Sequence, residues 1–186
     1  MKTEHRLAEA LKSLMATTPL SDITVTTLTK KCHIGRQSFY YHFHDIYDLL
    51  TLVFLDEKIP GIESVNNIKN LIKIIYEYYT DNKAFIDATI DSSGKDLFQE
   101  FIFNQIYKTF MRFIKDIPES NRLTSSDMKN IARFYSLGYS YSLVYYLENY
   151  KNKTLNGLYN SICFESDQSL VNAVRNLIKK RGQPQW

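Results

Sequence analysis

Apolar residues recur along the chain with the spacing of helices rather than of strands. In residues 4–16, the apolar side chains of Leu7, Leu11, Leu14 and Met15 fall at i, i+4, i+7 and i+8, which is one stripe of a helix. The same reading predicts further helices at about 25–32, 36–42, from 46, 68–79, 82–91, from the Ser93–Asp96 segment to 116, 126–150 and 166–180. No segment alternates convincingly with period two. We therefore predict an all-α fold of about nine helices.

Breaks in this pattern divide the chain into two parts. Pro60-Gly61 interrupts the helical spacing, and we predict an N-terminal domain over residues 1–56 and a larger helical domain over residues 57–186. Within the second part, Thr124-Ser125-Ser126-Asp127 has the sequence of a capping box, with a hydroxyl at the cap and an acid three residues later. Residues 152–165 are polar and are predicted to form a loop.

Composition agrees with a helical protein of the cell interior. The chain has 14 Tyr and 11 Phe but only 6 Gly and 4 Pro, too few turn residues for an all-β fold. Its two cysteines, Cys32 and Cys163, form no CxxC pair, which favours a reducing compartment. Charged residues interrupt the N-terminal segment, unlike a signal peptide, and no apolar run approaches the roughly 20 residues that span a bilayer. We expect a soluble, cytoplasmic protein.

The segment 23–43 contains the strongest functional signal. Two short helices joined by a three-residue turn that contains Gly35 are typical of a helix-turn-helix. The second helix of that motif enters the major groove with its N-terminal residues, here Arg36, Gln37 and Ser38. Arginine can form two hydrogen bonds with guanine, and glutamine can form two with adenine. We therefore predict that these three residues read bases.

Charge alone does not predict nucleic-acid binding. The net charge is +3, and the first 50 residues hold six basic and five acidic side chains. Attraction for phosphate then requires that basic residues cluster in space, together with helix N-termini. The candidates are Lys2, Arg6, Lys30, Lys31 and Arg36.

The first 50 residues combine a lone first helix, Ile23-Thr24-Val25, the turn with glycine, Phe39-Tyr40-Tyr41-His42-Phe43 and Leu49-Leu50. With these features they resemble the DNA-binding domain of TetR-type (TetR/AcrR) bacterial transcriptional regulators. Residues 42–50 also resemble a subgroup that includes regulators of dihydroxyacetone kinase operons. Beyond residue 50 the resemblance extends only to the layout of the helices.

This resemblance implies a homodimer that binds a palindromic operator through residues 24–44 and holds a small-molecule effector in its C-terminal helices. The residues expected to contact DNA are Thr24, Thr26, Thr27, Arg36, Gln37, Ser38, Tyr40, Tyr41, His42 and His44. Two departures stand out. The family commonly has a lysine where this chain has Ile46, so His44 or Tyr47 would have to bind the phosphate instead. The glycine of the turn also comes one or two places later than the family pattern has it.

The C-terminal aromatic residues are candidates for an effector pocket, since ligand pockets favour aromatic walls with a few polar groups. The candidates are Tyr76, Tyr79, Phe98, Phe101, Tyr107, Phe134, Tyr135 and Tyr139, and a plain helix-bundle core is the alternative for each. Dimerisation is expected where the long helix and the last helix of each subunit form a four-helix bundle. The residues expected there are Gly138, Tyr141, Tyr145, Leu170, Val174 and Leu177.

Three other functions are alternatives to this one. A zinc site from Cys32, His33, His42 and His44 has the usual ligand types, but two of the residues straddle a helix end and Cys32 faces inward. An all-α enzyme lacks support, because the chain has no phosphate-binding loop, HExxH or nucleophile elbow. A helical adaptor that binds only protein is the third. We expect a regulator with double-stranded DNA as its partner and with no cofactor, metal or membrane.

Overall fold

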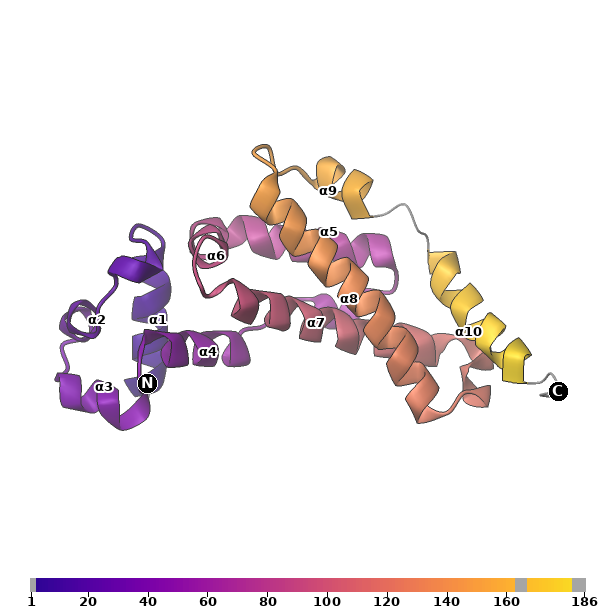
Figure 1. Ribbon diagram of the computed structural model, residues 1–186, viewed down its shortest axis with the longest axis horizontal. Coiled ribbons are helices and arrows are strands. Elements are labelled where there is room, and N and C mark those ends of the chain that lie inside the picture. Colours follow the sequence, from indigo (N-terminus) through magenta and orange to yellow (C-terminus); the bar gives the residue numbers. More distant parts are fainter. Residues whose placement is uncertain (1–2, 163–166, 182–186) are drawn as a thin grey trace. The chain divides into compact units, whose positions relative to one another are not determined.

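The computed structural model describes residues 3–162 and 167–181, and the regular elements in those ranges are helices, with no strand (Figure 1). Three short 3-10 turns, at Leu20–Asp22, Ile62–Ser64 and Pro118–Arg122, accompany ten α-helices in the described part of the chain. The helices are α1 (Thr3–Met15), α2 (Val25–Lys31), α3 (Arg36–His42), α4 (Ile46–Asp56), α5 (Ile68–Asp81), α6 (Lys83–Ile90), α7 (Lys95–Asp116), α8 (Ser125–Asn149), α9 (Leu155–Ile162) and α10 (Asp167–Arg181).

The predicted all-α class is confirmed, and one local prediction is wrong. Residues 152–165 were expected to form a loop, yet Leu155–Ile162 form helix α9. The Thr154 hydroxyl accepts a hydrogen bond from the Gly157 amide at 3.0 Å, which satisfies a free donor of the first turn. Leu158 and Ile162 are buried one turn apart, so a short apolar stripe was present in a segment that otherwise looks polar. Cys163 lies outside the described residues.

The capping box predicted before the longest helix is present. The Thr124 hydroxyl accepts from the Asp127 amide at 3.2 Å, and the Asp127 carboxylate accepts from the Thr124 amide at 2.9 Å. Asp127 is buried, and these bonds supply its carboxylate with donors. Helix α8 therefore begins where the sequence predicts.

The chain divides into two compact units. Unit 1 holds residues 1–58 together with residues 79–101, and unit 2 holds residues 59–78 together with the rest of the chain. In unit 1, helix α1 packs against α2, α4 and α6, and α2 packs against α3. Leu7 and Leu11 are fully buried on the inward stripe of α1. The ring of Phe54 packs among three other phenylalanine rings, those of Phe85, Phe98 and Phe101.

Unit 2 is organised around α8. Helix α9 packs against α8, while α10 packs against both α8 and the 3-10 turn Pro118–Arg122. Arg175 of α10 donates to the Glu119 carboxylate from two nitrogens at 2.9 Å. Arg112 of α7 donates to the backbone carbonyls of Ile62 and Val65. Polar contacts thus hold the irregular segments of this unit to its helices.

Candidate nucleic-acid interface

Helix α2 is short and is set by its cap and by one buried residue. Thr24 accepts a hydrogen bond from the Thr27 amide at 3.1 Å, and the two hydroxyls lie 2.7 Å apart. Leu28 is fully buried and faces the core of unit 1. This register leaves Thr24, Thr26 and Thr27 exposed at the start of the helix.

The turn between α2 and α3 explains the late glycine. His33 has φ +51°, the left-handed conformation that usually favours glycine, whereas Gly35 has φ −78°. Gly35 is the residue before α3, and its carbonyl accepts from the Ser38 amide at 3.0 Å. An exposed histidine therefore occupies the left-handed position of the turn, and Gly35 is instead the N-cap residue of the next helix.

Helix α3 presents the predicted base-reading residues outward. Phe39 is fully buried and Phe43 is buried just after the helix, and their rings pack with centroids 5.6 Å apart. With this face fixed inward, Arg36 and Gln37 at the N-terminal end are exposed and Ser38 is half-buried. The exposed arginine and glutamine satisfy the geometric requirement for reading base edges.

The aromatic residues that follow lie around the same helix. Tyr40 and Tyr41 are 58% and 84% exposed, unusually open for large aromatic side chains. His42 is half-buried, with its Nδ1 3.1 Å from a Glu4 carboxylate oxygen of α1. His44 is exposed just beyond the helix. Four predicted contact residues thus surround the C-terminal end of α3.

The start of α4 differs from the family pattern in a physically consistent way. Ile46 is buried, so the side chain at this position faces the core. Asp45 caps the helix by accepting from the Asp48 amide at 2.8 Å. The Tyr47 hydroxyl accepts a hydrogen bond from Ser93. The two residues considered as replacements for the lysine, His44 and Tyr47, are both exposed, but the Tyr47 hydroxyl is already engaged by Ser93.

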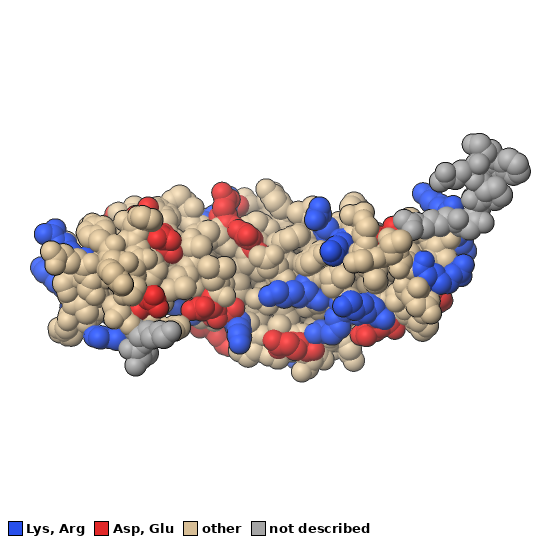
Figure 2. All heavy atoms as spheres, turned by 90° about the horizontal axis from the view of Figure 1, so that it is seen from below, with Lys and Arg blue, Asp and Glu red and all other residues tan. Residues whose placement is uncertain are grey.

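Basic side chains near this surface are few. Lys30 and Lys31 are exposed at the C-terminal end of α2, while Arg6 donates to the Cys32 carbonyl at 2.6 Å and so links α1 to the turn. Lys2 lies outside the described residues. Figure 2 shows basic and acidic side chains interspersed over the visible face, without a continuous basic surface. Attraction for phosphate therefore has to come from the positions of individual basic side chains rather than from the overall charge.

The structure does not group the residues considered for zinc. No set of three or more His, Cys, Asp or Glu side chains in the described chain is arranged to hold a metal ion. Cys32 is buried, and its thiol lies 3.5 Å from the Arg6 carbonyl. Burial raises the pKa of this thiol, which keeps it protonated.

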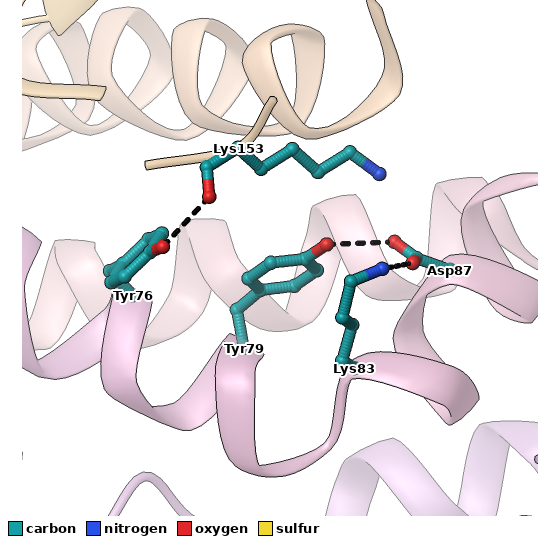
Figure 3. A network of polar contacts seen from close by, with 5 residues as sticks. All are labelled: Tyr76, Tyr79, Lys83, Asp87 and Lys153. Atoms are coloured by element: carbon teal, nitrogen blue, oxygen red, sulfur yellow. Dashed lines mark hydrogen bonds and ion pairs between the residues drawn. The ribbon is translucent and has the colours of Figure 1, made fainter. Parts of the chain in front are cut away.

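The candidate effector residues fall in different surroundings. Phe98 and Phe101 belong to the aromatic core of unit 1, where the Tyr79 hydroxyl also donates to Asp87 at 3.0 Å beside Lys83, which pairs with the same carboxylate (Figure 3). In unit 2, Tyr76 donates to the Lys153 carbonyl at 2.8 Å (Figure 3).

The remaining candidates all lie in unit 2. Tyr107 stacks on Phe103, Tyr135 donates to the Ser169 carbonyl at 2.9 Å, and Tyr139 is buried beside Phe110. Phe134 is 74% exposed.

A hollow on α8 brings part of this set together. It has a volume of about 440 Å³ and is lined by Phe134, Tyr135, Leu137, Gly138, Tyr139, Ser142 and Ile162. Three of the candidate effector residues and one candidate interface residue therefore share one hollow. Leu137, Ser142 and Ile162 were not predicted, although Leu137 and Ser142 follow from the helical spacing of α8.

The candidate interface residues divide between an exposed and a buried group. On α8, Gly138 is exposed, and Tyr141 and Tyr145 are 68% and 60% exposed. With Phe134 and Leu137 they form an apolar stripe along one side of the helix, which we call the α8 stripe. On α10, the side chains of Leu170 and Val174 are buried within the protomer and Leu177 is half-buried.

Comparison with known proteins gives the class of the molecule. Residues 66–163, more than half of the chain, match a family model described as the C-terminal region of transcriptional regulators, TetR type. No curated protein matches the chain. With its helix-turn-helix and larger helical part, the molecule is a transcriptional regulator rather than an enzyme. The chain belongs to the TetR-type family of transcriptional regulators.

A solved structure agrees with this fold. The dihydroxyacetone kinase operon activator DhaS is similar with a TM-score of 0.60 and 19% identity, over 96% of this chain and 97% of that one. A fatty acid metabolism regulator of Clostridium perfringens is similar with a TM-score of 0.48 and 19% identity, over 91% of this chain and 97% of that one. At this identity, the likeness to DhaS concerns the fold alone.

Among the described residues, no helix combines the length and the apolarity needed to cross a membrane.

Proposed function

We propose that the protein is a homodimeric, DNA-binding transcriptional regulator that binds a palindromic operator through α2 and α3 and is controlled by a small-molecule effector. The exposure of Arg36 and Gln37 at the start of α3, with Phe39 buried behind them, is the observation that supports DNA recognition most directly. DNA binding belongs to residues 1–56 in this proposal, and effector binding and dimerisation belong to residues 57–186. The protein acts in the cytoplasm.

Base reading and phosphate binding are assigned to different residues. Arg36, Gln37 and Ser38 enter the major groove, where arginine selects guanine and glutamine selects adenine. The phosphate backbone is contacted from both sides of α3, where hydroxyl, phenol and imidazole groups are accessible or partly accessible. These contacts come from Thr24, Thr26, Thr27, Tyr40, Tyr41, His42 and His44.

Dimerisation is assigned to the α8 stripe. Monomeric proteins rarely leave several large apolar side chains exposed together, and Tyr141 and Tyr145 are both mostly exposed. Gly138 has open space where a Cβ would lie, which permits close approach of a second helix. Helices α8 and α10 of two protomers would form a four-helix bundle and hold the two α3 helices about 34–36 Å apart, one turn of DNA.

The effector is assigned to the hollow on α8, whose aromatic walls suit a mostly apolar ligand with few polar groups. A ligand there changes DNA binding only if its affinity differs between two arrangements of the dimer. Because the hollow includes Gly138 of the α8 stripe, an occupant would act on the same surface that sets the distance between the two protomers.

Selection of duplexes from a random pool by the purified protein tests the proposal. We expect a palindromic site whose affinity falls steeply with salt. Arg36→Ala should weaken binding to that site by about 1–3 kcal/mol and relax the preference at one base pair in each half-site. Arg122→Ala, which removes an exposed arginine of unit 2, is the matched control and should leave both quantities unchanged.

Two outcomes would contradict the assignment. A loss that is uniform across sequences would show that Arg36 holds phosphate instead of a base. The absence of any enriched sequence, with α3 protected only when another protein is present, would favour a protein-binding adaptor.

A further inference from the structure

Unit 1 contains a hollow that the proposed regulator does not use. It has a volume of about 450 Å³ and lies among the end of α1 with the segment that follows it, Tyr47 of α4, one face of α6, and the segment after α6. All of these residues belong to unit 1. It is separate from the hollow on α8, whose lining residues belong to unit 2.

The floor of this hollow is a face of α6. Ala84, Ala88 and Asp91 fall at i, i+4 and i+7, so they lie in a row along the helix and just beyond its end. Ala84 and Ala88 are neighbours on this face, one turn apart, and their short side chains leave space that longer side chains would fill. The Asp91 carboxylate is exposed at one end of this row.

Helix ends of both polarities lie at the hollow, and Asp91 has the one full charge in its described lining. Helix α1 ends at Met15 and helix α6 ends at Ile90, and both ends lie at its wall. These C-termini have partial negative charge from free carbonyl groups, while the N-termini of α4, beside Tyr47, and of α7, just after Ser93, have partial positive charge, so the helix ends do not set the sign. Asp91 adds a full charge, and no lysine, arginine or histidine lines the hollow within the described chain.

Two lysines on the helices beside the hollow are already paired. Lys12 of α1 forms an ion pair with Glu57 at 2.8 Å, and Lys83 of α6 pairs with Asp87. Neither is therefore free to neutralise Asp91.

The walls offer hydroxyl groups and one aromatic ring. Thr17, Thr18, Ser21, Ser92 and Ser93 supply oxygens that can accept hydrogen bonds. The Tyr47 ring adds a face that attracts cations, and its hydroxyl is held by Ser93. Hydroxyls can also donate, but four of the five already donate to other oxygens, namely Thr17, Ser21, Ser92 and Ser93. They therefore offer a ligand mainly acceptors, which suits ammonium groups because these are donors only.

We propose that this hollow binds a small organic cation with one or more ammonium groups, with Asp91 as its counter-ion. The occupant contacts the segment after α1, Tyr47 of α4 and the face of α6 together. It therefore ties α6 to the helices that position α3, and this site is independent of the effector assigned to α8.

Three four-carbon probes of matched length test the proposal by calorimetry or NMR titration of the full chain without DNA. We expect saturable binding of 1,4-diaminobutane, with 1,4-butanediol weaker by about tenfold or more and succinate not bound. Asp91→Asn should weaken the diamine by about tenfold or more while leaving the thermal midpoint unchanged. Asp81→Asn, an exposed carboxylate outside the hollow, is the matched control and should have no effect.

A second variant tests the location. Ala84→Leu fills the floor from an exposed position of α6, so the protein should fold while the diamine loses its site. The proposal is overturned if the diamine fails to saturate, if the diol or succinate binds equally well, or if neither Asp91→Asn nor Ala84→Leu changes its affinity. Because no DNA is present, none of these outcomes bears on operator binding.

Discussion

The residue that sets the helix-turn-helix angle is a histidine in a conformation suited to glycine. His33 has φ +51° and is exposed, so no buried contact compensates for its backbone conformation. Histidine tolerates this region better than most side chains, whereas a β-branched residue does not. The sequence alone indicated only that the glycine was late, because a left-handed backbone at a non-glycine residue has no sequence signature.

Substitution at this position should change stability in opposite directions. His33→Gly should raise the free energy of unfolding by up to about 1 kcal/mol, and His33→Val should lower it by about 1–2 kcal/mol. Gly35→Ala is the control, because its φ is −78° and a Cβ there meets nothing within 4 Å, so it should change stability by less than about 1 kcal/mol. Urea unfolding measures all three, and a destabilised His33→Gly would show that the turn is unstrained.

Single residues of the interface were predictable where a buried neighbour fixes their direction. The spacing of Phe39 and Phe43 indicated an inward face, and that face leaves Arg36 and Gln37 outside, as the structure has them. The partners of side chains were not predictable. The pairing of His42 with Glu4 and of Tyr47 with Ser93 joins residues 38 and 46 positions apart, and only the folded chain brings them together.

At the scale of elements, helices with long apolar stripes or clear caps were predictable and a short one was not. The Thr124–Asp127 signature located the start of α8 because both cap bonds are local. Helix α9 was missed because Gly157 and polar neighbours interrupt its short apolar stripe. A Cβ on Gly157 would lie 2.3 Å from the Tyr146 hydroxyl, so a tertiary contact with α8, rather than helix propensity, determines the residue at this place.

The contact between α10 and the turn Pro118–Arg122 should depend on pH. A hydrogen bond from its own backbone amide, and then the Arg175 guanidinium, lower the pKa of the Glu119 carboxyl. A lowered pKa contributes stability above the pKa of the unfolded chain, and this stability is lost as pH falls through the lower folded value. Arg175→Ala should therefore reduce the thermal midpoint at pH 7, with a difference from the wild type that shrinks below about pH 4.

Lys179→Ala provides the comparison for this pH dependence. It removes the same charge from an exposed position of the same helix. We expect it to leave the midpoint nearly unchanged at both pH values, because exposed charges without a fixed partner contribute little. A pH-independent effect of Arg175→Ala would mean that its hydrocarbon stem, rather than its charge, stabilises the contact.

For the whole molecule, the proposed dimer and the proposed DNA surface can be separated by charge substitutions at exposed tyrosines. Tyr141→Asp with Tyr145→Asp should convert the dimer to a monomer, because two buried carboxylates would face an apolar interface. Affinity for a palindromic site should fall sharply, since each protomer then binds one half-site. Sedimentation at several protein concentrations measures the first effect and a binding titration measures the second.

Tyr41→Asp is the control for both measurements. Tyr41 is exposed on unit 1, so its substitution should leave the protein dimeric and weaken DNA binding by repulsion from phosphate. Retention of the dimer in the Tyr141→Asp, Tyr145→Asp protein would show that a surface other than the α8 stripe joins the protomers.

The composition of unit 1 limits how its helix-turn-helix can be grafted onto another protein. Phe54, near the end of α4, packs against rings that come from residues 85, 98 and 101, beyond the intervening residues 59–78 of unit 2. A chimera cut after residue 58 would leave that phenylalanine facing water and deprive α1 of α6, so a graft built on the usual boundary would aggregate or unfold. A graft that folds has to include residues 79–101 as well. Unit 1 can therefore be moved to another protein only as two separate segments of the chain.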